Sequence, residues 1–196
     1  MKHLVIYVPG LGDKRLYAGA LRTALALWRT SRVRTYYFVV KWADKSEHYD
    51  VKLQRLLDTI DDQVAKGYTV SLVAASAGSS LALTAYAHRK AKIHTVTSVC
   101  GKLHNPGAIS EALFAINPAF RASLRAYERI ESTLNQHDRK KVLIVRAWRD
   151  VYVPAEDGEV VGAHTHIQPT MGHVFSVIMA LTFCRWPILR FIKRGV

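Results

Sequence analysis

An apolar run in the first half of the chain leads straight into a serine and then into a segment of helical period. The run is Tyr68–Ala75, the serine is Ser76, and the helical segment begins at Gly78. Ala74 and Gly78, two positions to either side of the serine, are both small, as they must be where a strand and the following helix nearly touch. A serine at such a turn takes a strained backbone conformation and presents its hydroxyl beyond the strand. The pattern therefore predicts a strand–serine–helix elbow.

Apolar runs and helical segments alternate along the rest of the chain. This alternation is typical of βα units and predicts a parallel sheet with helices on both faces. Several runs are almost continuously apolar, as expected of strands covered on both sides. The predicted strands are Lys2–Val8, Arg34–Val40, Tyr68–Ala75, Ile93–Cys100, Lys141–Ala147 and Ala163–Ile167. The predicted helices are Tyr17–Arg29, Glu47–Lys66, Gly78–Lys90 and His173–Cys184.

One connection is too long for a simple crossover. Between Gly101 and Arg139 the chain carries two further helical stretches, Ile109–Ile116 and Ala119–Asn135. An insertion of this size in an α/β sheet is a common place for a lid. We expect a single domain spanning residues 1–196, with residues 101–139 as a lid-like insertion.

The composition is that of a globular protein. The 196 residues are enough for one buried core, 49% of them are hydrophobic, and no low-complexity segment interrupts them. The cysteines, Cys100 and Cys184, form neither a disulfide framework nor a metal pair, which fits a reducing compartment. The early apolar run Leu4–Val8 is too short for a secretory signal. These features predict a cytoplasmic protein.

The chain is strongly basic, with a formal net charge of +13. Such a charge indicates either a solvated basic surface or an anionic partner. The cations are scattered along the whole chain rather than gathered on one recognisable nucleic-acid module. We therefore expect no nucleic-acid partner.

Ligands of open α/β sheets bind beyond the carboxyl ends of the strands, so these ends carry the candidate site. The first strand ends in the glycine-rich turn Pro9–Asp13, the third delivers Ser76, Asp150 follows the fifth, and His173 follows the sixth. The glycine-rich turn fits backbone N–H groups aimed at a developing negative charge, or a phosphate cradle. It lacks the third glycine of a dinucleotide fingerprint and the Gly-Lys-Ser/Thr of a P-loop.

Ser76, Asp150 and His173 together match the needs of nucleophilic catalysis. A serine hydroxyl needs a base within hydrogen-bond reach, and that base needs an acceptor that fixes its tautomer. His173 and Asp150 supply these two roles, although each alone could simply cap or pack. Three carboxylates farther from the end of the fifth strand are alternatives to Asp150: Glu156, Asp157 and Glu159.

Two histidines on one strand face, His164 and His166, are the main candidates for a metal site. No third Cys, Asp or Glu lies at ligand spacing from them. We therefore expect no metal.

With these strand ends, the chain resembles the α/β-hydrolase superfamily over nearly its whole length. Strand one with its glycine-rich turn is similar to the oxyanion strand of that family, although Pro9 stands where a His is usual. The resemblance implies that Ser76 is the nucleophile, His173 the general base and acid, and Asp150 its orienting partner. It implies that the backbone N–H groups of Leu11 and Ala77 form the oxyanion hole. It also implies six parallel strands in the order 2-1-3-4-5-6, without the two leading antiparallel strands of the full fold.

The expected activity is hydrolysis of carboxylic esters, on a small-molecule acyl ester and without a cofactor. Thioesters and lactones react through the same tetrahedral chemistry, and a binding protein whose triad does not turn over is an alternative of a different class. Phe114 and Phe120 of the insertion are expected to line an acyl pocket, or alternatively to pack on the sheet.

The C-terminal part combines apolar and basic residues. Val174–Cys184 is too short to span a bilayer, so we expect a core-packed final helix. Beyond it, residues 187–196 interleave apolar side chains with three cations. This mixture predicts either peripheral contact with an anionic membrane, or with another subunit, or a tail folded back onto its own domain. The oligomeric state is left open.

Overall fold

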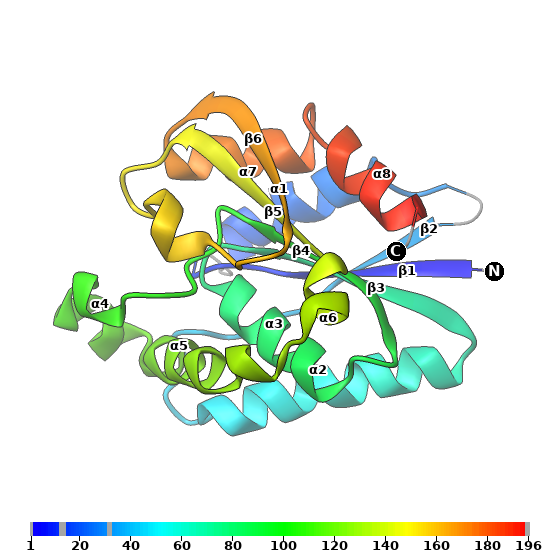
Figure 1. Cartoon of the computed structure of the whole chain (residues 1–196). Coiled ribbons are helices and arrows are strands. Elements are labelled where there is room, and N and C mark those ends of the chain that lie inside the picture. The colour runs from blue at the N-terminus through cyan, green and yellow to red at the C-terminus, as the bar shows by residue number, and fades with distance from the viewer. Residues whose placement is uncertain (1, 12–14, 31–32, 195–196) are drawn as a thin grey trace.

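The chain folds as a parallel sheet between two layers of helices (Figure 1). The computed structural model describes residues 2–11, 15–30 and 33–194. Its six strands are all parallel and lie in the order β2-β1-β3-β4-β5-β6, which confirms the predicted topology. The strands are β1 (Lys2–Val8), β2 (Val33–Tyr37), β3 (Tyr68–Ala75), β4 (Ile93–Val99), β5 (Val142–Arg149) and β6 (His164–Met171).

The helices divide between the two faces of the sheet. Figure 1 shows α1, α7 and α8 above the sheet and α2, α3, α5 and α6 below it. The α-helices are α1 (Arg15–Ala26), α2 (Tyr49–Ala65), α3 (Gly78–His88), α4 (Glu111–Ile116), α5 (Pro118–Ile130), α6 (Gln136–Lys140), α7 (His173–Leu181) and α8 (Trp186–Arg194). Short 3-10 turns lie at Pro106–Ala108, Glu131–Thr133 and Ala155–Gly158.

Burial follows the position of each strand in the sheet. From Val70 to Ala75, the central strand β3 is buried at every residue, because helices cover both of its faces. The edge strands β2 and β6 alternate between more and less buried positions. The prediction of Arg34–Val40 as the second strand extends too far, since β2 ends at Tyr37. The sixth strand is longer than the predicted Ala163–Ile167 and reaches Met171.

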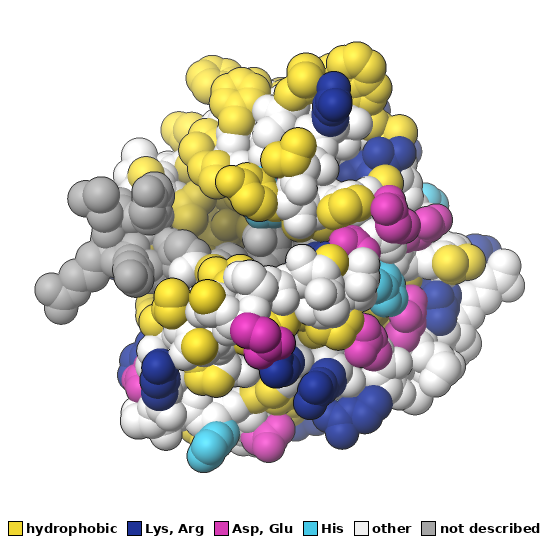
Figure 2. All heavy atoms as spheres, turned by 90° about the vertical axis from the view of Figure 1, so that its left-hand side faces the viewer, with side chains coloured by type: hydrophobic (Ala, Val, Ile, Leu, Met, Phe, Trp, Pro, Cys, Tyr) yellow, Lys and Arg dark blue, Asp and Glu magenta, His cyan; other side chains and the backbone are white. Residues whose placement is uncertain are grey.

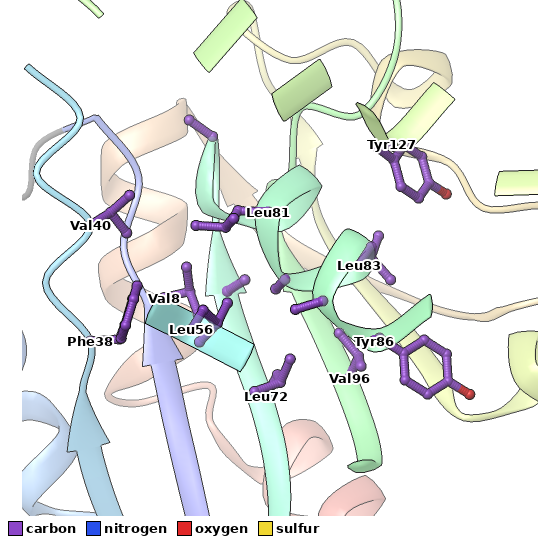
Figure 3. Close-up of a cluster of buried hydrophobic side chains, with 14 of the residues drawn as sticks. Val8, Phe38, Val40, Leu56, Leu72, Leu81, Leu83, Tyr86, Val96 and Tyr127 are labelled. Atoms are coloured by element: carbon purple, nitrogen blue, oxygen red, sulfur yellow. The ribbon is translucent and has the colours of Figure 1, made fainter. Parts of the chain in front are cut away.

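The larger core lies between the sheet and the layer formed by α2, α3 and α5 (Figure 3). Leu72 and Val96 of the strands lie in one cluster with Leu56 of α2 and Leu81 of α3. Helix α3 is buried from Gly78 to Tyr86, because the sheet covers one side of it and α5 the other. A helix that is apolar on every side requires such double cover.

A second core fills the opposite face of the sheet. Val5 and Val73 of the strands pack there with Trp28, which follows α1, and with Ile188 and Ile192 of α8. The indole N–H of Trp28 donates to the carbonyl of Leu181 at 2.7 Å, which ties the end of α1 to the end of α7. Of the two alternatives for the C-terminal tail, the packing of residues 187–194 supports the one in which the tail folds back onto its own domain.

The expectation of a core-packed final helix at the C-terminus needs correction. The helix that begins at His173 ends at Leu181, and a further helix, α8, follows it. Only Ser176, Ala180 and Leu181 of α7 are buried, while its opposite side is open to solvent. Within the described residues, no single helix is long and apolar enough to cross a membrane. In the same part of the chain, only α7 and α8 taken together, with a bend of 54° between them, have the length and composition of a membrane span.

The start of α3 lies against the end of β1. A Cβ atom at Gly78 would overlap the carbonyl oxygen of Val8 and lie 2.6 Å from that of Pro9. Because real Cβ atoms do not approach backbone oxygens so closely, the residue at this position must be glycine. Sequence reasoning identified Gly78 as a small residue for this reason.

Glycine-to-alanine substitutions at Gly78, which makes this contact, and at Gly19, which makes none, should have opposite effects on stability. Gly78→Ala should lower the free energy of unfolding by about 1–3 kcal/mol, since β1 and α3 must move apart. Gly19→Ala in α1, where a Cβ meets nothing within 4 Å, should raise it by about 0.5–1 kcal/mol. Chemical denaturation of the two variants measures both changes. Equal stability of the Gly78→Ala variant and the unmodified protein would contradict the close contact.

Candidate active site

Ser76 lies in a strained turn between β3 and α3. Its φ is +51°, in the region that side chains other than glycine rarely adopt and that costs about 1–3 kcal/mol. Its N–H donates to the carbonyl of Val99 at 3.0 Å, and its carbonyl accepts from the N–H groups of Ser79 and Lys102 at 3.0 and 3.3 Å. These bonds to the end of β4 and to the start of α3 hold the conformation, and the side chain remains half-buried at the surface.

The turn after β1 packs directly on this serine. A Cβ at Gly10 would lie 2.9 Å from the Cβ of Ser76 and 3.5 Å from its hydroxyl oxygen. The indole N–H of Trp42 donates to the carbonyl of Pro9 at 3.0 Å and fixes the turn from below. Sequence reasoning did not identify Trp42, whose place in a loop gives no local signal. Gly12 and Asp13 of the same turn lie outside the described residues.

Leu11 and Ala77 occupy the two positions predicted for an oxyanion hole. Gly10 and Ser76 pack against each other, and Leu11 and Ala77 are the residues that directly follow them in the chain. Among the residues that the structure describes, neither backbone N–H donates to a protein acceptor. Backbone N–H groups without a protein acceptor are what an oxyanion hole requires, so the assignment of Leu11 and Ala77 to this role stays a prediction.

His173 connects the serine to a carboxylate. It is the first residue of α7, and the N–H of the preceding Gly172 donates to the carbonyl of Arg149 at 2.9 Å. The Nε2 atom of His173 lies 2.9 Å from the hydroxyl oxygen of Ser76. Its Nδ1 atom lies 2.7 Å from Oδ2 of Asp150. If Asp150 is ionised it can only accept, so Nδ1 carries the proton and Nε2 is the acceptor for the serine hydroxyl.

Asp150 is held as an anion at the end of β5. Its second carboxylate oxygen accepts from the backbone N–H groups of Tyr152 and Val153 at 2.9 and 3.1 Å. Burial raises the pKa of this carboxyl, but the hydrogen bond and charge of His173 and the two backbone donors outweigh it, so the pKa lies below its ordinary value. The carboxylate is therefore charged and oriented at neutral pH.

The other candidate carboxylates lie away from the histidine. Glu156 and Glu159 are exposed. Asp157 forms a buried ion pair with Lys102, and its carbonyl accepts from the N–H groups of Leu103 and His104. Only Asp150, of the carboxylates considered from the sequence, contacts His173 in the described part of the chain.

The pair of Lys102 and Asp157 was not identified from the sequence. Both side chains are almost fully buried, at 5% and 4% exposure. They join the loop after β4, whose Lys102 N–H bonds the Ser76 carbonyl, to the loop that carries Asp150. Gly158 lies so close to Gly101 that a Cβ there would be 2.6 Å from the Gly101 carbonyl oxygen. A lysine directly after an apolar strand was the available signal, but its partner lies 55 residues away.

Phe114 and Phe120 lie together in the larger core. Their ring centroids are 5.7 Å apart, and Phe120 packs edge-on against Trp42 at 6.0 Å. Both side chains are buried. A cleft of about 170 Å³ adjoins Asp150 between the ends of β4 and β5, and neither phenylalanine lines it. The role of these residues in an acyl pocket therefore stays a prediction.

Three other histidines make structural contacts. A ring nitrogen of His94 lies 3.2 Å from the carbonyl of Ile192, and one of His104 lies 3.0 Å from that of Glu159. His164 packs its ring against Phe191. Within the described residues, no group of three or more His, Cys, Asp or Glu side chains is placed to hold a metal ion.

Solved structures share this architecture. A structure of the metagenome-derived lipolytic enzymes LipS and LipT matches with a TM-score of 0.68 and 14% identity, over 99% of this chain and 94% of that one. The monoacylglycerol lipase of Paleococcus ferrophilus matches with a TM-score of 0.63 and 14% identity, over 97% and 94% of the two chains. The dienelactone hydrolase of Anabaena variabilis matches with a TM-score of 0.67 and 16% identity, over 100% and 87%.

The chain has the α/β-hydrolase fold. No protein-family model matches the sequence, and no curated protein matches it either. At identities this low, the likeness of the α/β-hydrolase structures concerns the fold alone, so the chemistry has to be argued from the site.

The buried ion pair behind the site predicts a large loss of stability on substitution. Asp157→Asn leaves the Lys102 ammonium buried without its counter-charge and should lower the free energy of unfolding by about 3–5 kcal/mol. Asp62→Asn breaks a pair with Lys66 in which both side chains are more than half exposed, so it should change stability little. Urea denaturation compares the two variants. Equal midpoints would show that the ion pair does not hold the two loops.

Proposed function

We propose that this protein is a serine hydrolase that cleaves carboxylic esters through an acyl-enzyme on Ser76. The observation that carries the proposal is the series of hydrogen bonds from Asp150 through His173 to Ser76 at the carboxyl edge of the sheet. The structural neighbours are described as lipolytic enzymes, a monoacylglycerol lipase and a dienelactone hydrolase, which supports an ester substrate.

In the first half of the reaction, the hydroxyl oxygen of Ser76 attacks the acyl carbonyl carbon while its proton passes to Nε2 of His173. The Asp150 carboxylate stabilises the resulting imidazolium. The negative charge on the former carbonyl oxygen is bound by the backbone N–H groups of Leu11 and Ala77. When the intermediate collapses, Nε2–H gives its proton to the departing alkoxide, and the acyl group remains on Ser76.

In the second half, a water molecule takes the place of the alcohol. His173 removes a proton from this water as it attacks the acyl carbonyl, and the same oxyanion site binds the second intermediate. Collapse breaks the bond to the serine oxygen, which recovers its proton from Nε2. The products are a carboxylic acid and an alcohol, and no cofactor takes part in any step.

Thioesters and lactones are alternative substrates for the same residues, since attack on their carbonyl groups follows the same steps. An alternative of another class is a binding protein that holds an anionic partner without turnover. A fluorophosphonate probe separates these classes, because it labels an activated serine whatever the substrate. Cytoplasmic location and the lack of a nucleic-acid partner stay predictions, the first resting on the two free cysteines.

Substitution of the nucleophile is the first test of the proposal. Ser76→Ala should abolish hydrolysis of short p-nitrophenyl esters and labelling by the probe, because the attacking oxygen is removed. Ser79→Ala is the matched control, since Ser79 lies in the first turn of α3 with a buried hydroxyl that has no partner among the described residues. Full activity of the Ser76→Ala protein would disprove the mechanism.

Substitution of the acid tests the role of the hydrogen bond at Nδ1. Asp150→Asn should lower kcat by about 10⁴-fold, because the amide stabilises the wrong histidine tautomer. Among folded molecules, Asp157→Asn should retain far more activity than Asp150→Asn. Steady-state kinetics, normalised to the fraction folded by circular dichroism, makes the comparison. The reverse order of activities would assign the acid to Asp157.

We further propose that residues 101–139 act as a lid within one domain that spans residues 1–196. The position of α4 supports this role, because it lies on the side of the molecule toward which the strands point (Figure 1). A lid there would cover the acyl group bound to Ser76, with Phe114 and Phe120 as its apolar contacts.

The lid proposal predicts a change in chain-length preference. Phe120→Leu should shift the ratio of kcat/KM values between long and short acyl esters by a few-fold, since the pocket gains room at one side. Phe38→Leu is the control, because Phe38 is buried in the same core. Loss of stability in both variants with the same ratio would show that Phe120 only packs in the core.

A further inference from the structure

Exposed apolar side chains surround the candidate active site. Six of them lie within two residues of Asp150 or His173 in the chain, and each is between 54% and 75% exposed. Figure 2 shows hydrophobic side chains gathered over the upper part of this face of the molecule. We call these six residues the site patch: Trp148, Val151, Tyr152, Met171, Val174 and Phe175.

The site patch is continuous with the catalytic side chains and with α7. The ring of Tyr152 packs edge-on against that of His173, with 6.0 Å between their centroids. One helical turn beyond Val174, Ile178 is also exposed, and Phe183 follows the end of α7 with 79% exposure. Single exposed apolar residues are ordinary, but a contiguous group marks an interaction surface.

Arg149 brings a positive charge to the edge of the site patch. Arg149, which pairs with Met171 across the sheet, is exposed. Residues 160–196, which include β6, α7 and α8, contain no Asp or Glu, but Arg190, Lys193 and Arg194 lie in α8, whose end contacts the amino ends of β4 and β6 rather than the site. Between residues 139 and 155 the sole carboxylate is Asp150, which the histidine engages. Glu156 and Glu159, both exposed, follow in the same loop, so the site patch is an apolar surface with charges of both signs nearby, on a chain whose net charge is +13.

This combination favours a lipid surface over a second copy of the chain. A second copy would bring two molecules of net charge +13 together and increase their mutual repulsion. A bilayer with anionic headgroups offers negative charge for Arg149 and for the net positive charge of the chain, and an apolar layer for the aromatic and aliphatic side chains. Trp and Tyr side chains, both present in the site patch, favour this boundary.

We propose that the site patch docks on anionic membranes, so that an acyl ester anchored in the bilayer reaches Ser76 without crossing water. The docking stands on the exposed residues and charges, whereas the substrate rests on the proposed function. Helix α7 lies along the surface in this arrangement, with Ala180 and Leu181 in the core and Val174 and Ile178 outward. Docking thus involves α7, since Ile188 and Ile192 of α8 are used in the core.

Vesicle sedimentation tests the docking independently of catalysis. The Ser76→Ala protein is mixed with phosphatidylcholine vesicles with and without about 30% phosphatidylglycerol. In this background, the double variant Val174→Ser/Phe175→Ser should partition at least about tenfold more weakly, since transferring one large apolar side chain from water already changes an equilibrium by about that factor. Raising the salt concentration should weaken binding to the anionic vesicles.

The matched control carries the same kind of change near the amino ends of the strands, at the opposite end of the sheet from the site. Leu27 and Val161 are 59% and 72% exposed, and they lie just after α1 and just before β6. Leu27→Ser/Val161→Ser should bind within about twofold of the parent, because these residues lie outside the contact. Docking is disproved by a lack of lipid-dependent pelleting or by equal losses in both double variants. A patch-dependent dimer in light scattering, without lipid binding, would assign the surface to a second copy.

A kinetic measurement tests the docking separately from the proposed esterase function. With Ser76 restored, the rate on a long-chain ester embedded in anionic vesicles is divided by the rate on a soluble short-chain ester. We expect this ratio to fall in the patch variant and to stay near the parent value in the control. Vesicle binding without hydrolysis of either ester would retain the docking and reject the esterase. Hydrolysis of the soluble ester without vesicle binding would reject the docking alone.

Discussion

The contact between the start of α3 and the turn after β1 is the constraint on which the rest of the site depends. Gly78 lies against the carbonyls of Val8 and Pro9, and Gly10 lies against Ser76. With the two backbones in contact, Ser76 has a positive φ, and both of its backbone polar groups are hydrogen-bonded. The strain of about 1–3 kcal/mol is offset by the surrounding packing, because β3 and α3 are among the most deeply buried elements. The serine hydroxyl is therefore placed by the core of the fold.

The other two members of the hydrogen-bonded series reach Ser76 because β5 and β6 are held to the same frame. His173 is 97 residues from Ser76 in sequence, so its place depends on strand pairing rather than on local structure. The bond from the Gly172 N–H to the Arg149 carbonyl joins the ends of β5 and β6 at the residues just before Asp150 and His173. The buried pair of Lys102 and Asp157 joins the Asp150 loop to the segment whose N–H bonds the Ser76 carbonyl. The members of the hydrogen-bonded series are thus also held in place by contacts between residues that take no part in the proposed reaction.

Local sequence signals predicted the six strands, with differences at the ends of β2 and β6, and the residues at their carboxyl ends, whereas the strand order was implied by the resemblance to the α/β-hydrolase superfamily. Ser76 and Asp150 each follow a strongly apolar strand, and His173 follows the more polar β6, so the parallel topology brings all three to the carboxyl ends of the strands. Their catalytic roles remain proposals. Other features had no local signal, because they depend on pairs of distant residues. Neither Lys102 with Asp157 nor Trp42 with Pro9 can be read from a spacing, since their partners lie on separate loops. The earlier end of β2 has a related cause, because an edge strand has a neighbour on one side only.

Helices α3 and α7 show why a sequence cannot by itself tell a buried apolar helix from an exposed one. Both are apolar on most of their circumference, and both begin at a residue next to or within the candidate site. α5 covers the outer side of α3, so that nine of its eleven residues are buried. Over α7 the described residues place no such layer, and Val174, Phe175 and Ile178 face solvent. An apolar sequence such as that of α7 is compatible with a buried helix and with an exposed one. Only the arrangement of the neighbouring elements decides whether the helix is covered. An apolar face left uncovered beside Ser76 is costly in water, and under the proposed docking a lipid surface removes that cost at the point where the proposed ester substrate enters.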